Sequence, residues 1–190
     1  MDARRLVTGF ILAFVAVLLA GTGARDQLAF AALARSQGSR AGMLIAGLTV
    51  SIVTALFVGW AASMVAPMLN SDARLFLAAL ALGFAGLEAL LLRPARHAAE
   101  PTHSIGALII VLASLQLTDA ARFLIFGIAL AVNAPLPSAI GGAAGGMVLL
   151  ACAWAWPKIF TWQLLRRPRH AIGAGLLLLS AWSGLRALGI

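Results

Sequence analysis

Charged side chains are scarce in this sequence. Of 190 residues, 11% are Asp, Glu, Lys or Arg, whereas 62% are hydrophobic, and the mean hydropathy is +1.00. An average soluble domain carries roughly 25% charged residues. A soluble fold of this length keeps too large a surface fraction to bury so much apolar side chain. The composition therefore predicts a polytopic membrane protein whose principal partner is the lipid bilayer.

Cysteine and catalytic motifs are also nearly missing. The single cysteine, Cys152, lies in an apolar run, so it can form no internal disulfide and is expected to be a small packing residue. The sequence has no P-loop, nucleophile elbow, CxxC or HExxH motif. We therefore expect no enzyme and no resident cofactor.

The acidic residues are outnumbered, six against 14 Lys and Arg, for a net charge of +8. The arginines fall mainly in short gaps between apolar runs, as the positive-inside rule requires, so nucleic acid is not the expected partner. The first apolar run leads directly into further ones and is expected to be a retained anchor.

Apolar runs of about 20 residues predict membrane-spanning helices. They form two triplets related by a shift of 95 residues, which predicts two inverted three-helix repeats, residues 1–95 and 96–190. Such repeats in secondary transporters bind substrate near the membrane midplane, where the halves meet. The first and fourth runs are long for one span and must tilt, kink or extend past the hydrocarbon. The expected all-α fold has six spans: 6–34, 41–66, 73–92, 104–131, 136–157 and 171–189.

Loop charges predict the orientation. Eight basic residues fall on one side of the predicted membrane, in the gaps 35–40, 93–103 and 158–170, and four fall on the other. The positive-inside rule places the first set in the cytoplasm. We therefore expect a multi-pass protein of the cell inner membrane with both termini non-cytoplasmic.

Five ionisable residues are expected at membrane depth, away from the ends of the predicted spans. Each costs roughly 2.5–3.5 kcal/mol at a helix centre, so such residues are usually paired, inward-facing and functional. Glu88 is close to Arg93 and is interpreted as reaching the interface. The other four are Arg25, Asp26, Asp119 and Arg122.

The stretch "LQLTDAARFLIF", 115–126, places Gln116, Asp119 and Arg122 at intervals of three, which predicts one side of one helix. Two interpretations remain open. Asp119 and Arg122 neutralise each other while Gln116 bonds a neighbouring helix. Alternatively, Asp119 and Gln116 offer oxygen ligands to a metal cation, or Asp119 binds a proton, and Arg122 tunes the site.

A second polar patch, "GTGARDQLAF" at 21–30, lies near the matching place in the first half. It combines small residues with Arg25, Asp26 and Gln27. Recurrence of a polar, glycine-rich patch in both halves predicts a site at the interface of the repeats.

At these two patches the chain resembles the Golgi-type Gdt family of manganese/calcium cation–proton antiporters, part of the lysine-exporter superfamily. That family opens each repeat with E-x-G-D-[KR]-[ST], often followed by Q-hydrophobic-A. In "GTGARDQLA" the residues Gly23, Arg25, Gln27 and Ala29 match, and in "QLTDAARF" Asp119 matches. "GLEALLLRP" and "IGGAAGGMVLL" are similar to the third and fifth helices of that family.

The resemblance implies divalent cation–proton exchange by alternating access between the first and fourth helices, with Mn or Ca as transported substrate. Of the four motif carboxylates only Asp119 is kept, and it would be the central titrating group. Gln116 would be a neutral ligand and Asp26 a second carboxylate. Arg25, Gln27 and Arg122 would pair with or tune the site. A transporter of an anion or zwitterion with this fold, and a non-transporting structural protein, remain alternatives.

Three further patterns predict structural roles. Small residues four apart on the fifth span predict close helix contact: Gly141, Gly142, Gly145 and Gly146. Tryptophans around Lys158 predict an interfacial belt: Trp154, Trp156 and Trp162. Three histidines are expected in cytoplasmic loops without a metal motif: His97, His103 and His170.

Overall fold

The computed structural model of the chain describes residues 3–92 and 104–190. The secondary structure of these residues is helical. The elements are α1 (Ala3–Gly21), α2 (Arg25–Gln37), α3 (Ala41–Val65), the short 3-10 helix η1 (Ala66–Met68), α4 (Ser71–Leu91), α5 (Ile105–Leu117), α6 (Ala120–Val132), α7 (Pro135–Ala155) and α8 (Trp162–Ala187).

The long helices are apolar enough to cross a bilayer. Four stretches of the described residues have the necessary length and hydropathy, and the bent pair α5–α6 makes a fifth. Large apolar side chains such as Ile110 and Leu178 are mostly exposed, as expected of a lipid-facing surface. The chain is therefore an all-helical protein with the properties of a membrane-embedded one. The four stretches are Ala3–Gly21, Ala41–Met68, Ser71–Leu91 and Pro135–Ala155.

Two of the predicted spans are not continuous helices. The run 6–34 is divided into α1 and α2, because Gly23 has a φ of +76°, which L side chains rarely adopt. The run 104–131 is divided into α5 and α6, which meet at an angle of 52°. The second break follows from Asp119, whose extended backbone and side chain form the N-cap of α6.

The sixth predicted span, 171–189, lies mostly within a longer helix. Helix α8 begins at Trp162, so the expected cytoplasmic loop "RRPRH" at 166–170 is helical. Pro168 lies inside this helix, and Arg169 is buried. Helix α8 is not among the stretches of the described residues that are long and apolar enough to cross a membrane.

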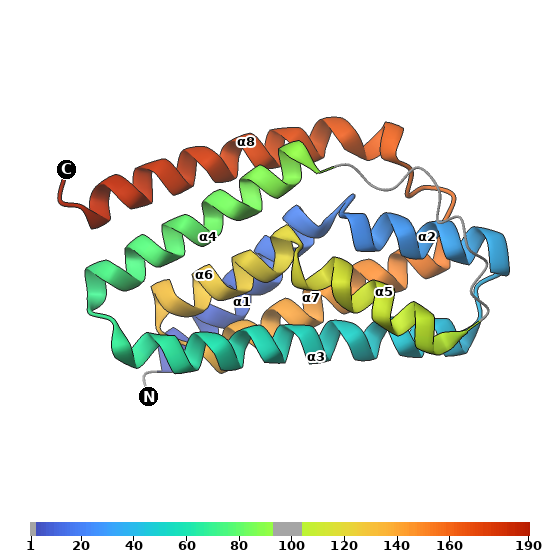
Figure 1. Cartoon of the computed structure of the whole chain (residues 1–190), viewed down its shortest axis with the longest axis horizontal. Coiled ribbons are helices and arrows are strands. Elements are labelled where there is room, and N and C mark those ends of the chain that lie inside the picture. Colours follow the sequence, from blue (N-terminus) through green and yellow to red (C-terminus); the bar gives the residue numbers. More distant parts are fainter. Residues whose placement is uncertain (1–2, 93–103) are drawn as a thin grey trace.

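Helices α4 and α8 form one layer along the molecule and α3 and α7 lie on the opposite side, with α1 and α6 between them (Figure 1). The direction of the chain is opposite in the two broken pairs: α1–α2 runs away from the end that holds both termini, and α5–α6 runs back toward it. The breaks therefore bring four helix ends to the middle of the molecule.

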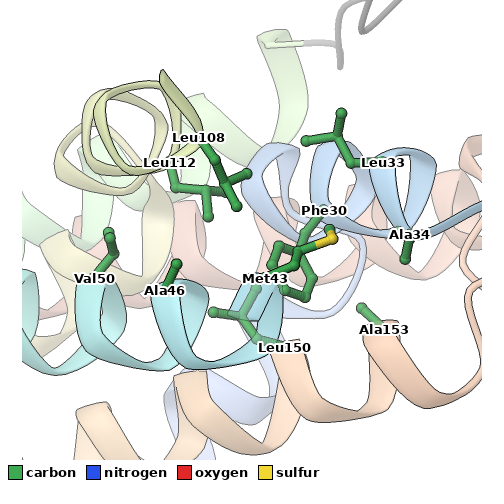
Figure 2. Close-up of a cluster of buried hydrophobic side chains, with 11 residues drawn as sticks. Phe30, Leu33, Ala34, Met43, Ala46, Val50, Leu108, Leu112, Leu150 and Ala153 are labelled. Carbon is green, nitrogen blue, oxygen red and sulfur yellow. The ribbon is translucent and has the colours of Figure 1, made fainter. Parts of the chain in front are cut away.

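An apolar cluster anchors the half-helices α2 and α5 on α3 and α7 (Figure 2). The Phe30 ring lies at its centre beside Met43, and Gly47 leaves room for that ring: a Cβ there would be 2.8 Å from a ring carbon. This packing fixes the middle of each half-helix.

The glycines of α7 have the predicted packing role. Gly141 and Gly145 face the backbone of α1, where added Cβ atoms would contact the carbonyl oxygens of Phe10 and Phe14. Gly142 faces Ile125 of α6, and Gly146 faces Ser51 of α3. Small side chains on several faces of α7 therefore let three helices approach closely.

Candidate functional site

Buried polar side chains gather where the two helix breaks meet. The breaks are in direct contact, because Arg25 Nη2 donates hydrogen bonds of 3.1 Å to the Thr118 carbonyl and hydroxyl oxygens. Buried polar groups in an apolar surrounding are costly unless they are hydrogen-bonded or functional. The buried polar residues around the breaks are Asp26, Gln27, Ser51, Thr54, Glu88, Gln116, Asp119, Arg122 and Arg169.

A small cavity lies between the breaks. Its volume of about 10 Å³ matches one water molecule or one ion. Asp26 lines it from the first turn of α2, and Asp119 and Arg122 line it from the start of α6. Both carboxylates thus lie at helix N-termini, where the helix dipole favours negative charge.

Asp119 is 1% exposed, and its two carboxylate oxygens have different partners. Oδ2 accepts a hydrogen bond of 3.3 Å from the backbone N–H of Ala121, which caps α6. Oδ1 is buried and has no hydrogen bond, and its nearest cationic atom is Arg169 Nη2 at 3.8 Å. One oxygen of Asp119 therefore holds the structure and the other is free for a ligand.

Arg122 is tied to oxygens on two other elements. Its Nη2 donates to Gln116 Oε1 at 2.5 Å and to Thr54 Oγ1 at 2.7 Å, and the Thr54 hydroxyl itself lies 2.9 Å from Gln116 Oε1. Ser51 supplies two longer contacts of 3.4 Å. The prediction that Gln116, Asp119 and Arg122 share one side of one helix is wrong, because the break at Asp119 separates them. The Asp119–Arg122 ion pair is likewise not among the ion pairs of the described residues.

Gln27 and Asp26 stabilise the first break. Gln27 Oε1 accepts a 2.7 Å hydrogen bond from Gly23 N, and its amide nitrogen donates to the Leu149 carbonyl at 3.2 Å. Asp26 Oδ1 accepts from Gln27 N at 2.7 Å. Gln27 therefore supports the break rather than facing the cavity with its carbonyl oxygen.

The prediction that Glu88 reaches the membrane interface is wrong. It is 5% exposed and accepts from Arg25 Nε at 2.9 Å with Oε1, while Oε2 pairs with Arg169 Nη2. The carboxylate stays inside because the buried guanidinium of Arg169 and the half-buried guanidinium of Arg25 pair with it. Arg169, predicted in a loop, is 1% exposed and also donates to the Ala20 carbonyl at 3.2 Å.

Three polar residues of this site were missed by sequence reasoning. Ser51 and Thr54 are three apart in an otherwise apolar run, so they share a helix face, and that spacing was the available signal. Arg169 gave no signal of its own, because it stands in a basic cluster that looks like a loop.

The formal charges around the breaks balance. Arg25, Arg122 and Arg169 oppose the carboxylates of Asp26, Glu88 and Asp119. No group of three or more His, Cys, Asp or Glu side chains among residues 3–92 and 104–190 is arranged to hold a metal ion. Asp26 and Asp119 are the two carboxylates that line the cavity, with Arg122 as the one cation beside them.

The remaining sequence predictions concern the periphery. His170 lies in α8 rather than in a loop and makes an edge contact with Trp162. His97 and His103 lie outside the described residues. Trp154 donates to the Arg40 carbonyl at 3.1 Å, and Trp156 is exposed.

Thr54→Val is expected to lower the free energy of unfolding by about 1–3 kcal/mol, because Arg122 and Gln116 lose a buried hydroxyl partner. Thermal unfolding of the detergent-solubilised protein measures this. Thr22→Val is the matched control, since that hydroxyl bonds only the Leu18 carbonyl of its own helix. Equal losses for the two variants would show that the Thr54 contacts contribute little.

No family model, curated protein or solved structure matches this chain.

Proposed function

We propose that this protein is a secondary transporter of inverted-repeat architecture that exchanges an inorganic cation for protons at the cavity between the two helix breaks. The observation that carries the proposal is the meeting of Asp26 and Asp119 at one buried cavity, each at the start of a half-helix. Discontinuous helices that point their ends at a central site are the usual construction of such transporters.

The boundaries of the elements support the repeat. Moving α2, 25–37, by 95 residues gives 120–132, the bounds of α6. The same shift superimposes the two N-cap residues, Ala24 and Asp119. In this proposal the breaks are equivalent features of two halves, 1–95 and 96–190.

Packing around the two breaks supports the same relation. Gly47 lies against Phe30, and the residues 95 positions later, Gly142 and Ile125, are in the same kind of contact. A twofold relation also requires equivalent helices to pack on each other at the axis. Helix α3 packs along α7, and α4 packs along α8, as that symmetry predicts.

A cation is the substrate that the cavity favours. Two carboxylates line it against one guanidinium, and the Arg122 guanidinium is already bonded to Gln116 and Thr54. Hard cations and protons bind carboxylate oxygen. The resemblance to the Gdt family adds Mn²⁺ and Ca²⁺ as the first cations to test. The Gln116 oxygen accepts two hydrogen bonds in this conformation, so its place as a ligand requires that Arg122 and Thr54 release it.

Alternating access requires that the two ends of the molecule open in turn. At the end far from the termini, Arg35 Nη1 donates to the carbonyls of Pro157 at 2.6 Å and Phe160 at 3.1 Å, which ties α2 to the α7–α8 connection. At the other end, α1 and α7 are closed by glycine contacts. Opening at either end would bend the chain at the breaks.

In the proposed membrane orientation both termini are non-cytoplasmic, in the cell inner membrane. Burial of Arg169 removes one charge from the predicted cytoplasmic set and leaves seven there against four on the other side. The asymmetry of loop charge therefore remains in the same direction.

Purified protein in liposomes loaded with a pH-sensitive dye tests the function. External Mn²⁺ or Ca²⁺ is expected to drive proton release from the lumen, with no response in protein-free liposomes. Proton movement driven instead by an amino acid or inorganic anion would support the anion or zwitterion alternative. Absence of a response to every solute would favour a structural role.

A further inference from the structure

The arginine that sequence reasoning assigned to a loop occupies a distinctive place in the site. Arg169 Nη2 faces two carboxylates from different helices: it pairs with Glu88 Oε2 of α4 and lies 3.8 Å from Asp119 Oδ1 at the start of α6. Its Nη1 is held by the Ala20 carbonyl at the end of α1. The Arg169 guanidinium thus lies beside three elements: the end of α1, helix α4 and the start of α6.

The hydrogen bonding of this arginine is incomplete. Among the three arginines around the breaks, Arg169 alone retains a buried nitrogen, Nε, without a hydrogen bond. Asp119 Oδ1, which lies 3.8 Å from Arg169 Nη2, is also buried and has no hydrogen bond. A buried donor and a buried acceptor that both lack partners cost free energy, and a small movement of the guanidinium toward Asp119 would satisfy the oxygen.

The neighbouring arginines are fixed in comparison. Arg122 is bonded to Gln116, Thr54 and Ser51, and Arg25 to Glu88 and Thr118. Because Arg25 also neutralises Glu88, that carboxylate keeps a cationic partner when Arg169 moves away. Arg169 is therefore the cation that can change partner without leaving a buried carboxylate unpaired.

We propose that Arg169 is a tethered competitor for the cation at Asp119. When the transported cation leaves, the guanidinium moves toward Asp119 and occupies that carboxylate until the exchanged proton binds; when a cation binds, Arg169 returns fully to Glu88. This rests on the proposed function and adds the means by which bound cation is released. Glu88 does not bind the cation itself and acts through Arg169.

A double-mutant cycle on Mn²⁺ affinity separates this exchange of partners from a fixed electrostatic field. Arg169→Gln is expected to tighten Mn²⁺ binding about tenfold or more, because the competing charge is gone. Glu88→Gln is expected to weaken binding, because Arg169 then stays on Asp119. In protein that already carries Arg169→Gln, the further change Glu88→Gln is expected to leave the Mn²⁺ affinity unchanged, because Glu88 acts through Arg169. Titration calorimetry on the full-length protein in detergent measures all four affinities.

A fixed field gives a different pattern. Loss of the Glu88 charge would then weaken Mn²⁺ binding by the same factor whether or not Arg169 is present, and that additivity would overturn the inference. Arg167→Gln is the matched control, because Arg167 is exposed on the same helix, and its Mn²⁺ affinity should equal that of the wild type.

A second cycle needs no cation and remains informative if Glu88→Gln fails to fold. In cation-free protein, Asp119→Asn and Arg169→Gln together should lower the melting temperature by less than the sum of the single changes, by roughly 2–4 °C. Additive losses would overturn the inference while leaving the proposed function intact. Wild-type protein that binds neither Mn²⁺ nor Ca²⁺ would instead overturn the proposed function and the competition that depends on it.

Discussion

Asp119→Asn is expected to reduce metal-driven proton movement to the rate of protein-free liposomes. Asp119 is the buried carboxylate whose Oδ1 lacks a hydrogen bond while the side chain lines the cavity. Asparagine carries no charge and releases no proton in the physiological range, so neither the cation nor the exchanged proton would have its principal ligand. The dye-loaded liposomes described above measure the loss.

This substitution separates charge from structure. Asparagine is as good an N-cap as aspartate, so the hydrogen bond from Ala121 N that begins α6 can be kept. The melting temperature in detergent should therefore fall by only a few degrees, because the charge that Arg169 faces is lost while the helix start is kept. Asp72→Asn in the first turn of α4 is the control, since that carboxylate is exposed and outside the cavity. Wild-type rates in Asp119→Asn would remove this residue from the mechanism, although transport itself would stand.

The sequence was sufficient to predict the apolar helices and the two regions where polar groups meet. Composition alone indicates a bilayer, and the shift of 95 residues relates the polar patches at 21–30 and 115–126. The helices themselves were placed well where apolar runs end at turn-forming residues, as at Asn70, which caps α4. These features are local, so a pattern along the chain is enough to find them.

The breaks within the patches were harder to find. A long apolar run does not reveal a change of direction, and Thr118–Asp119 resembles an ordinary polar pair in a helix until its extended N-cap conformation is known. At the first break the signal was stronger, because Gly21 and Gly23 flank Thr22 and glycine supplies the positive φ that the turn needs. Treating an aspartate after threonine as a helix start would have located the second.

Ion pairing between distant helices could not be predicted from the sequence. Glu88 pairs with Arg25 and Arg169, which are 63 and 81 residues away, and no spacing rule connects them. Charge counting even favoured the wrong location for Arg169, because a basic cluster near the end of an apolar run usually marks a loop. Only tertiary contact shows that one of these arginines is turned inward and balances the buried acids.

The second large effect concerns the close contact of α1 with α7. Gly141→Leu is expected to lower the free energy of unfolding by about 3 kcal/mol or more, because the new Cβ would collide with the backbone at Phe10 and no side-chain rotation can relieve it.

Gly175→Leu on α8 is the control, since a Cβ there meets nothing within 4 Å. Both changes replace a helical glycine by the same residue, so their effects on helix propensity cancel in the comparison. Urea or thermal unfolding in detergent gives the difference, and equal stability of the two variants would mean that α1 and α7 do not pack through their backbones.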